Sequence, residues 1–288
     1  MPGKEKRKAL VLGGGGLTGS GWLIGMLCGL VDAGIDILRA DLVVGTSSGA
    51  LVGAQLTTGC DLEVLYSQVI DKASPEPALE LSTAAHTALG GMLGGAQSPQ
   101  LCRARVGKAA LADKSASTSL SAFIGARLPD AEWPDRELCV TSVDAETGEF
   151  VVFDSGSGLS LLDAVTASCA LPFIYPPARA LGRRWMDGFI KSPANVDVAG
   201  DYERIVVLAP MPEGFAAGSR VIDQTAELAS RTGAMIATVV ADEVPVRPLD
   251  PALLPDAARA GRAQAESAAT EVAAVWNAPS APRPQAVR

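Results

Sequence analysis

The chain has 288 residues and a formal net charge of −8 at pH 7, with a sequence pI near 4.8. This acidic balance, without a basic stripe and interleaved aromatics, argues against a nucleic-acid partner and favours a neutral or zwitterionic ligand over a strongly anionic one. The five cysteines include no Cys-x-x-Cys pair, so we expect reduced thiols in a cytoplasmic protein and no zinc site. No apolar run reaches the roughly 18 residues of a membrane span, which leaves peripheral contact as the expected way to touch a membrane.

The start of the chain is basic and precedes an apolar run, in the order found in signal peptides. The glycines that begin at Gly13 interrupt this run almost at once, so it is too short for the apolar core of a signal peptide. We therefore expect the basic start to be a solvated arm.

Residues 9–12 are predicted to form a short buried strand that runs directly into the glycine-rich segment 13–21. Apolar residues from Trp22 to Val31 then recur at helical spacing. The glycines thus lie at a junction between a strand and a helix, where backbone N–H groups without helical partners point outward. Such groups can bind an anion, including the oxyanion of an acyl-transfer reaction.

Ser47 lies in a Gly-x-Ser-x-Gly pattern between a predicted strand at 41–45 and a predicted helix at 50–58. This order is typical of a nucleophile elbow, in which a tight turn between small residues exposes the serine hydroxyl. Ser47 is therefore the candidate nucleophile. A plain glycine-rich turn explains the short pattern equally well until other features are added.

His86 is the single histidine of the chain, so any triad based on histidine must use it. An α/β-hydrolase places its acid and then its histidine after the serine, and no acid at a strand end precedes His86 here. We interpret His86 as a surface or packing residue and expect another group to activate Ser47.

The periodicity loosens after residue 71, and we expect residues 72–105 to form a mobile cover segment. Two glycine pairs flank Met92 and Leu93, which predicts an apolar tip that covers an active site or touches a lipid surface. A loosely packed surface loop is the alternative.

The remaining elements follow from apolar periodicity. Strands are predicted at 137–143, 149–153 and 204–208, with a hairpin turn at 144–148. Helices are predicted near 109–112 and at 117–127, 161–170, 221–230 and 256–276. A last strand and a proline-rich connection are predicted within 239–251, and the proline-rich tail, 278–288, is expected to be disordered. Strands that alternate with helices favour a mostly parallel sheet covered on both faces.

Asp187 is the candidate partner of the serine. An Asp-Gly pair such as Asp187-Gly188 is by itself usually a turn. Here it precedes Pro193 and Asn195, and it follows the segment Ala-Ser-Cys-Ala-Leu-Pro-Phe-Ile-Tyr-Pro-Pro at 167–177. The glycine loop, the elbow serine, this segment and the Asp-Gly pair, in this order, resemble the patatin-like phospholipase family over residues 8 to about 210.

The resemblance implies a three-layer α/β/α sandwich with a mostly parallel central sheet, and a serine hydrolase that cleaves acyl esters of lipids through a Ser–Asp dyad. Ser47 is then the nucleophile and Asp187 its base or orienting partner. The amides of Gly14, Gly15 and Gly16 form the oxyanion hole. The implied substrate is a lipid or another acyl ester of the phospholipase A, lipase or esterase type, and the reaction needs no metal or organic cofactor.

Two positions depart from the family pattern. Thr18 stands where the glycine loop commonly carries a basic residue, and Phe189 stands where the Asp-Gly pair is commonly followed by Gly or Ala. Phe189 and the nearby Leu171 and Phe173 are apolar, and we expect these three side chains to line a pocket for an aliphatic acyl chain.

The serine and the aspartate must meet across the intervening sequence, so we expect a single domain over 1–277. The sequence predicts neither the head group, nor the acyl-chain length, nor the oligomeric state.

Other classes remain open at this stage. The glycine loop formally matches the Gly-x-Gly-x-x-Gly dinucleotide fingerprint, but the acidic residue, Asp41, lies at the start of the second strand and not at its end. A phosphate-binding P-loop lacks its Gly-Lys-Ser/Thr. A non-catalytic relative that binds a lipid or a partner protein is a further alternative, as is an acyltransferase that uses the same serine.

Overall fold

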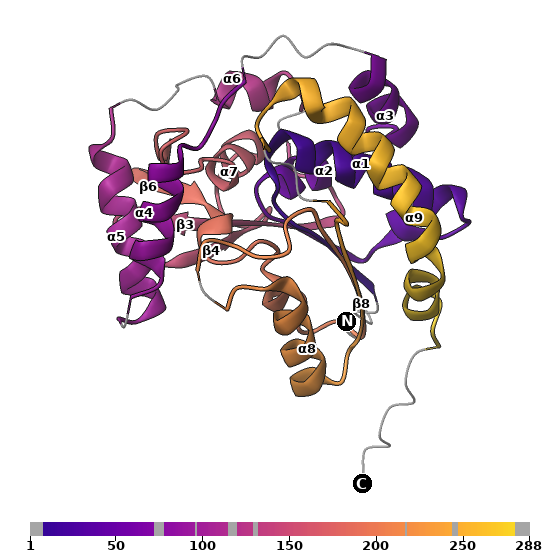
Figure 1. The fold of residues 1–288 in the computed structure, drawn as a ribbon. Coiled ribbons are helices and arrows are strands. Elements are labelled where there is room, and N and C mark those ends of the chain that lie inside the picture. Colours follow the sequence, from indigo (N-terminus) through magenta and orange to yellow (C-terminus); the bar gives the residue numbers. More distant parts are fainter. Residues whose placement is uncertain are drawn as a thin grey trace, which may run out of the picture.

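The structure is a computed structural model, and it describes residues 8–71, 78–95, 97–114, 120–128, 132–216, 218–243 and 247–279. In these ranges an eight-stranded, mostly parallel sheet lies between helices on both of its faces (Figure 1). This arrangement confirms the predicted α/β/α sandwich.

The strands of the described residues are β1 (Lys8–Leu12), β2 (Leu42–Gly45), β3 (Glu137–Asp144), β4 (Phe150–Phe153), β5 (Ala178–Ala180), β6 (Arg183–Asp187), β7 (Arg204–Ala209) and β8 (Met235–Val240). Their order is β5-β6-β3-β2-β1-β7-β8, and β4 pairs with β3. The five strands β3, β2, β1, β7 and β8, which are neighbours in this order, run parallel to one another. The pairs β3–β4, β3–β6 and β5–β6 are antiparallel.

The helices are α1 (Gly16–Asp32), α2 (Ser48–Thr57), α3 (Leu62–Asp71), α4 (Thr83–Leu93), α5 (Pro99–Ala112), α6 (Leu120–Gly125), α7 (Leu161–Ser168), α8 (Val221–Thr232) and α9 (Leu254–Trp276). Short 3-10 turns lie at Ile37–Arg39, Gly188–Ile190, Val196–Ala199 and Pro251–Leu253.

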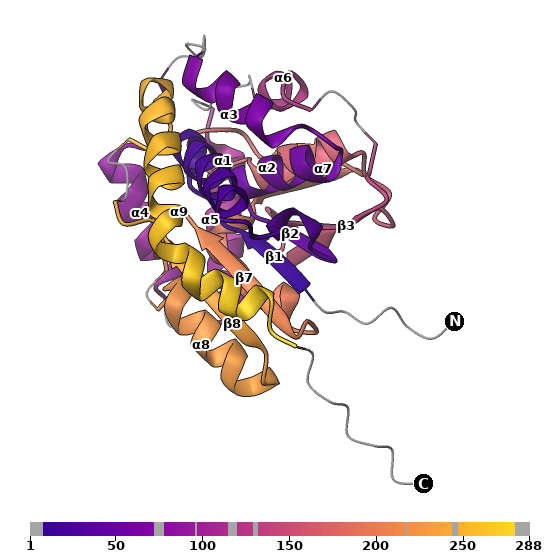
Figure 2. The same ribbon diagram turned by 90° about the vertical axis from the view of Figure 1, so that its right-hand side faces the viewer.

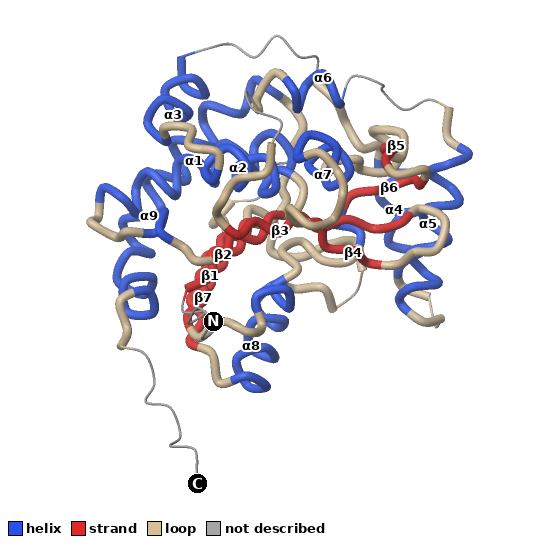
Figure 3. The backbone as a smooth tube through the Cα atoms, turned by 180° about the vertical axis from the view of Figure 1, so that it is seen from behind, coloured by secondary structure: helices blue, strands red, loops and turns tan. Residues whose placement is uncertain are grey.

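Alternation along β1 defines the two faces of the sheet. Leu10 and Leu12 pack into a core shared with α1, α2, α7 and α9, whereas Ala9 and Val11 pack into a second core shared with α8 and the Val196–Ala199 turn. Both sets are buried, which explains why β1 is a continuous apolar run. Figure 3 shows the strands crossing the middle of the molecule between these helices.

The helices α4 and α5 replace the expected mobile loop. Ser82 caps α4 by accepting a hydrogen bond from the Ala85 amide, and Leu89 is fully buried in a third core with residues of α5, β3 and β6. Met92 and Leu93 pack against this core and do not form a projecting tip. The predicted apolar tip is thus the end of a helix that the burial of Leu89 anchors, and the mobility of the segment stays a prediction. Residues 72–77 lie outside the described residues.

Two strands bring their carboxyl ends together on one side of β3. Val140 of β3 pairs with Gly45 and also with Phe153, and Ser142 pairs with Val151 and also with Asp187. Because Phe153 and Val151 belong to the same strand, β2 and β6 share the opposite side of β3. The strand β2 is parallel to β3 and β6 is antiparallel, so the two run toward each other and end close together.

The helices α1 and α9 pack against each other at close range (Figures 1 and 2). Gly25 faces the backbone of Ala258, and Gly29 faces Arg262 and Ala265. A side chain on either glycine would collide with α9, so these positions allow the two helix backbones to approach. The Arg262 side chain also donates to Asp32 at the end of α1.

Some elements were not predicted. Apolar periodicity predicted no strand at β5 or β6 and no helix at α3. The last strand was predicted within 239–251, whereas β8 spans Met235–Val240. Asp187 thus ends a strand that pairs with β3, a long-range contact that a local Asp-Gly pattern does not indicate. Of the expected disordered tail, residues 280–288 lie outside the described residues.

Within the described ranges, no helix combines the length and the apolar character that a crossing of a lipid bilayer requires.

Candidate active site

Ser47 occupies the sharp turn between β2 and α2. Its φ of 55° and ψ of −124° place a residue with a side chain in a conformation that normally favours glycine. Such a backbone costs on the order of 1–3 kcal/mol, and it persists only where the surrounding structure enforces it. The side chain of Ser47 is 9% exposed and lines a pocket, as expected for an elbow.

Neighbouring hydrogen bonds hold this turn. The Ser47 amide donates to Ser168 Oγ at the end of α7, at 2.9 Å. The Thr46 amide donates to the Leu12 carbonyl of β1, and the Thr46 hydroxyl is 2.9 Å from that of Thr141 on β3. The turn at Ser47 is thus tied to one helix and two strands.

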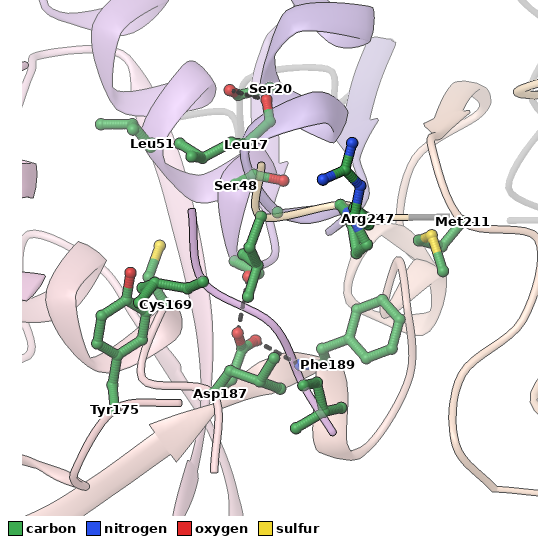
Figure 4. Close-up of a pocket in the computed structure, with 18 of the residues that line it drawn as sticks. Leu17, Ser20, Ser48, Leu51, Cys169, Tyr175, Asp187, Phe189, Met211 and Arg247 are labelled. Carbon is green, nitrogen blue, oxygen red and sulfur yellow. Dashed lines mark hydrogen bonds between the residues drawn. The ribbon is translucent and has the colours of Figure 1, made fainter. Parts of the chain in front are cut away.

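Asp187 meets Ser47 directly. Ser47 Oγ donates to Asp187 Oδ2 at 2.7 Å, and the Phe189 amide donates to Asp187 Oδ1 at 2.8 Å. Dashed lines in Figure 4 mark both hydrogen bonds. With 1% of its surface exposed, Asp187 has its two carboxylate oxygens directed by separate partners.

Burial changes the acidity of this carboxylate. Desolvation raises the pKa of Asp187 to about 7, and the hydrogen bonds from Phe189 and Ser47 oppose this shift. The ordinary pKa of an aspartate is near 4. A carboxylate with a pKa near neutrality can accept and return a proton at neutral pH, which an ordinary aspartate does poorly.

Asn195 connects the two halves of the pair. The side chain is fully buried, and its amide nitrogen lies within 3.0–3.3 Å of Thr46 Oγ1, Thr141 Oγ1, the Gly188 carbonyl and the Ser192 carbonyl. These acceptors belong to the serine turn, to β3 and to the turn after Asp187. Asn195 therefore fixes the serine and the aspartate relative to each other.

The glycine loop crosses beside Ser47. The Gly14 amide donates to the Pro193 carbonyl at 2.8 Å, so it is not available to a ligand. The amides of Gly15 and Gly16 lie at the start of α1 and have no acceptor among the described residues. Gly16 has a φ of 66°, and a side chain there would collide with the Pro248 carbonyl.

Thr18, at the first departure from the family pattern, is fully buried. Its amide donates to the Pro248 carbonyl at 3.0 Å, and its hydroxyl lies 3.3 Å from the same oxygen. Thr18 thus ties the glycine loop to the segment that precedes α9.

A cavity of about 510 Å³ opens above Ser47 and Asp187. Its wall is mostly apolar, and Figure 4 shows Leu17 and Leu51 on one side, Tyr175 and Cys169 on another, and Met211 and Arg247 opposite them. Charged groups at the wall besides Asp187 are Glu80, Glu213 and Arg247, of which Arg247 is paired with Asp250 at 2.8 Å.

Two of the three side chains expected to line the pocket do so. Leu171 and Phe189 line the cavity, whereas Phe173 does not and packs against the core of α4, α5 and β6. His86, an exposed residue of α4, lines the cavity and contacts the Phe215 ring at 5.3 Å between ring centroids. His86 thus contacts an aromatic ring, whereas the Ser47 hydroxyl donates to Asp187.

Ser168 and Asn195 were not assigned a role from sequence. Both lie in segments that contributed to the resemblance, so the signal was present in the motifs. Their hydrogen bonds to the serine turn span 121 and 149 residues, and no local pattern indicates such pairings. Among the described residues, no group of three or more His, Cys, Asp or Glu is placed to hold a metal ion.

This chain matches a family model and is similar to solved structures. A model of the family described as patatin-like phospholipase matches residues 10–199. VipD from Legionella pneumophila is similar with a TM-score of 0.45 and 13% identity, over 92% of this chain and 67% of VipD. ExoU from Pseudomonas aeruginosa, solved with SpcU, is similar with a TM-score of 0.42 and 18% identity, over 96% of this chain and 54% of ExoU. The chain thus spans about half the length of ExoU. The match to the family model covers more than half of this chain.

Proposed function

This chain belongs to the patatin-like phospholipase family, and from that premise we propose that it hydrolyses acyl ester bonds of lipids with Ser47 as nucleophile and Asp187 as base. The observation that carries the proposal is the 2.7 Å hydrogen bond from Ser47 Oγ to a buried carboxylate at the floor of an apolar cavity. A hydroxyl paired with a base and opening into a substrate-sized pocket is the arrangement that nucleophilic catalysis requires.

In the first step, Ser47 Oγ forms a bond to the carbonyl carbon of the ester while its proton passes to Asp187. The carbonyl π electrons move onto oxygen and produce a tetrahedral oxyanion. When the intermediate collapses, the bond to the leaving alkoxide breaks and Asp187 returns the proton to that oxygen, which leaves an acyl-Ser47. The raised pKa of Asp187, about 7, suits both the removal and the return of this proton near neutrality.

In the second step, water attacks the acyl-Ser47 while Asp187 takes a proton from it. The second tetrahedral oxyanion collapses, the bond to Ser47 Oγ breaks, and the proton on Asp187 returns to that oxygen. The products are a fatty acid and the free enzyme. In each of the two steps Asp187 accepts one proton and then returns it. The mechanism therefore requires neither a histidine nor a cofactor.

The oxyanion of both intermediates needs fixed donors. We assign this role to the amides of Gly15 and Gly16, because the Gly14 amide is bonded to the Pro193 carbonyl. The two amides lie where α1 begins, and their orphan N–H groups and the helix dipole both favour negative charge. Preorganised donors of this kind often contribute the largest share of catalysis in acyl transfer.

The cavity supports a long acyl chain as the substrate group. Its apolar wall and volume of about 510 Å³ suit an aliphatic chain, whose burial is favourable by about 0.8 kcal/mol per CH₂. We therefore expect kcat/KM to rise with acyl length from acetyl to longer esters. A strict preference for acetyl esters would contradict a lipid substrate.

Labelling with a fluorophosphonate, followed by mapping of the labelled peptide, tests the assignment. The label should lie on Ser47, and Ser47→Ala should lose both labelling and ester hydrolysis while its circular dichroism and melting temperature remain those of a folded protein. Labelling of another serine, or undiminished hydrolysis by Ser47→Ala, would contradict the proposal.

A further inference from the structure

Ser48 carries a hydroxyl that the proposed mechanism does not use. It directly follows Ser47 as the first residue of α2, it is 7% exposed, and it lines the cavity (Figure 4). Its Oγ has no hydrogen-bond partner among the residues that the structure describes. A buried hydroxyl without a partner destabilises a fold by about 1–3 kcal/mol, and one at a cavity wall can gain its partner from a bound ligand.

The other serine hydroxyls at the cavity wall are already engaged. Ser20 Oγ donates to the Leu17 carbonyl at 2.6 Å, and Ser47 Oγ donates to Asp187. The Ser48 hydroxyl, by contrast, has no acceptor among the described residues. A substrate atom is the partner that the cavity can supply.

The glycine-rich segment contacts both serines. Gly14 packs so closely on Ser47 that a Cβ added to it would lie 3.0 Å from Ser47 Cβ. Gly19, one turn into α1, packs in the same way on Ser48, with 3.3 Å from an added Cβ to Ser48 Oγ. Both serines therefore lie against the segment that carries Gly15 and Gly16, and these four residues line the same cavity.

We propose that the Ser48 hydroxyl donates a hydrogen bond to the carbonyl oxygen of the ester as it becomes the oxyanion, and so completes the oxyanion hole with a side-chain donor. The inference rests on the proposed function. No bond to Ser48 forms or breaks and its proton stays on Oγ. Only the strength of the hydrogen bond changes, because the acceptor gains charge when Ser47 attacks. The stabilisation is therefore larger in the transition state than in the ground state.

This role predicts a specific kinetic signature. Ser48→Ala should lower kcat by about 10- to 10³-fold, up to the range known for loss of one oxyanion donor, with KM changed only slightly. Ser48→Cys, which keeps nearly the same volume but offers only a weak donor, should lose most of the same kcat. The second variant preserves the test if the alanine variant does not fold.

Thr166 provides a matched control. Its hydroxyl is also buried without a partner among the described residues, but it lies on α7 and does not line the cavity. Thr166→Val removes that hydroxyl at nearly constant shape and should leave kcat and KM unchanged. If the two substitutions lower kcat alike, the effect of Ser48 is structural and the proposal is wrong.

Inhibitor binding gives a readout that a structural role would not change. A long-chain trifluoromethyl ketone adds to the nucleophile and forms a tetrahedral oxyanion, whereas the product fatty acid does not. Ser48→Ala should weaken the ketone by the factor by which kcat falls and leave fatty-acid affinity unchanged. Equal weakening of both ligands, or unchanged kcat, would overturn the proposal. Failure of the proposed function is distinct, because the wild-type protein would then neither hydrolyse esters nor label at Ser47.

Discussion

The floor of the cavity, around Ser47 and Asp187, and its cover, around Phe189, Phe215 and His86, are built in different ways. At the floor, Ser47, Asp187 and Asn195 are buried and are fixed by hydrogen bonds that connect β2, β3 and β6. At the cover, side chains meet through apolar contact, as where the Phe215 ring lies against the rings of Phe189 and His86. Reaction chemistry needs fixed directions, which hydrogen bonds supply, whereas an acyl chain needs only volume and an apolar wall.

Removal of the proposed base, Asp187, should have the largest effect. Asp187→Asn should lower kcat by about 10⁴-fold, the scale known for crippling a triad member, whereas His86→Gln should keep most of the activity. The reason is that Ser47 Oγ donates to Asp187, while His86 contacts a ring of the cover. Steady-state kinetics of both variants on one ester provide the measurement. A loss in His86→Gln equal to that in Asp187→Asn would assign the base to the histidine.

Loss of the Asn195 side chain, which fixes Ser47 relative to Asp187, should have the next largest effect. Asn195→Ala leaves the hydroxyls of Thr46 and Thr141 and two buried carbonyls without their shared donor. We expect kcat to fall by up to about 10²-fold through loss of alignment, and the free energy of unfolding to fall by about 1–3 kcal/mol. Asn277→Ala, at the exposed end of α9, is the control and should change neither. Wild-type labelling rates in Asn195→Ala would show that the serine does not depend on this hub.

The buried charge of the floor should appear in pH profiles. Because burial raises the pKa of Asp187 to about 7, kcat/KM should fall about tenfold per pH unit below that value and reach a plateau above it. The same shift means that ionised Asp187 opposes folding, so its contribution to stability falls as the pH rises from about 4 to 7. Asp187→Asn should therefore raise the free energy of unfolding above pH 7, by on the order of 4 kcal/mol, and not at pH 4. A stability difference that is independent of pH would contradict this.

A change in the cover should have the smallest effect and should depend on the substrate. Phe189→Leu alters the cavity wall, so kcat/KM should fall by about 10-fold or less for long-chain esters, with short-chain esters hardly affected. Phe173→Leu is the matched control, because this ring packs away from the cavity. Equal effects of the two substitutions would show that the wall has been assigned wrongly.

The floor was largely predictable from sequence because its parts are local. A glycine-flanked serine after a strand and a glycine run before a helix are patterns of adjacent residues, and they indicated Ser47 and the loop. The exceptions are Ser168 and Asn195, which were not assigned a role, and Gly14, whose amide donates to the Pro193 carbonyl. These contacts join distant segments of the chain, and a local pattern does not predict them.

The cover was poorly predictable for a physical reason. The helix α4 contains Gly90 and Gly91, which lower its intrinsic helix propensity, and it forms because Leu89 is buried against α5 and the sheet. Likewise Phe173 lies outside the cavity because it packs on the core of α4, α5 and β6. Tertiary packing decides each of these, and the sequence pattern carries no comparable signal.

The close contact of α1 with α9 has a consequence for biosynthesis. The ribosome produces the glycine loop and α1 early, whereas the α9 surface that covers Gly25 and Gly29 follows more than 200 positions later. Contacts over such sequence separations form late and slow the folding reaction. A nascent chain that stops before α9 leaves the apolar side of α1 open to water, so we expect truncation at residue 250 to yield an aggregating, inactive product even though Ser47 and Asp187 are both present.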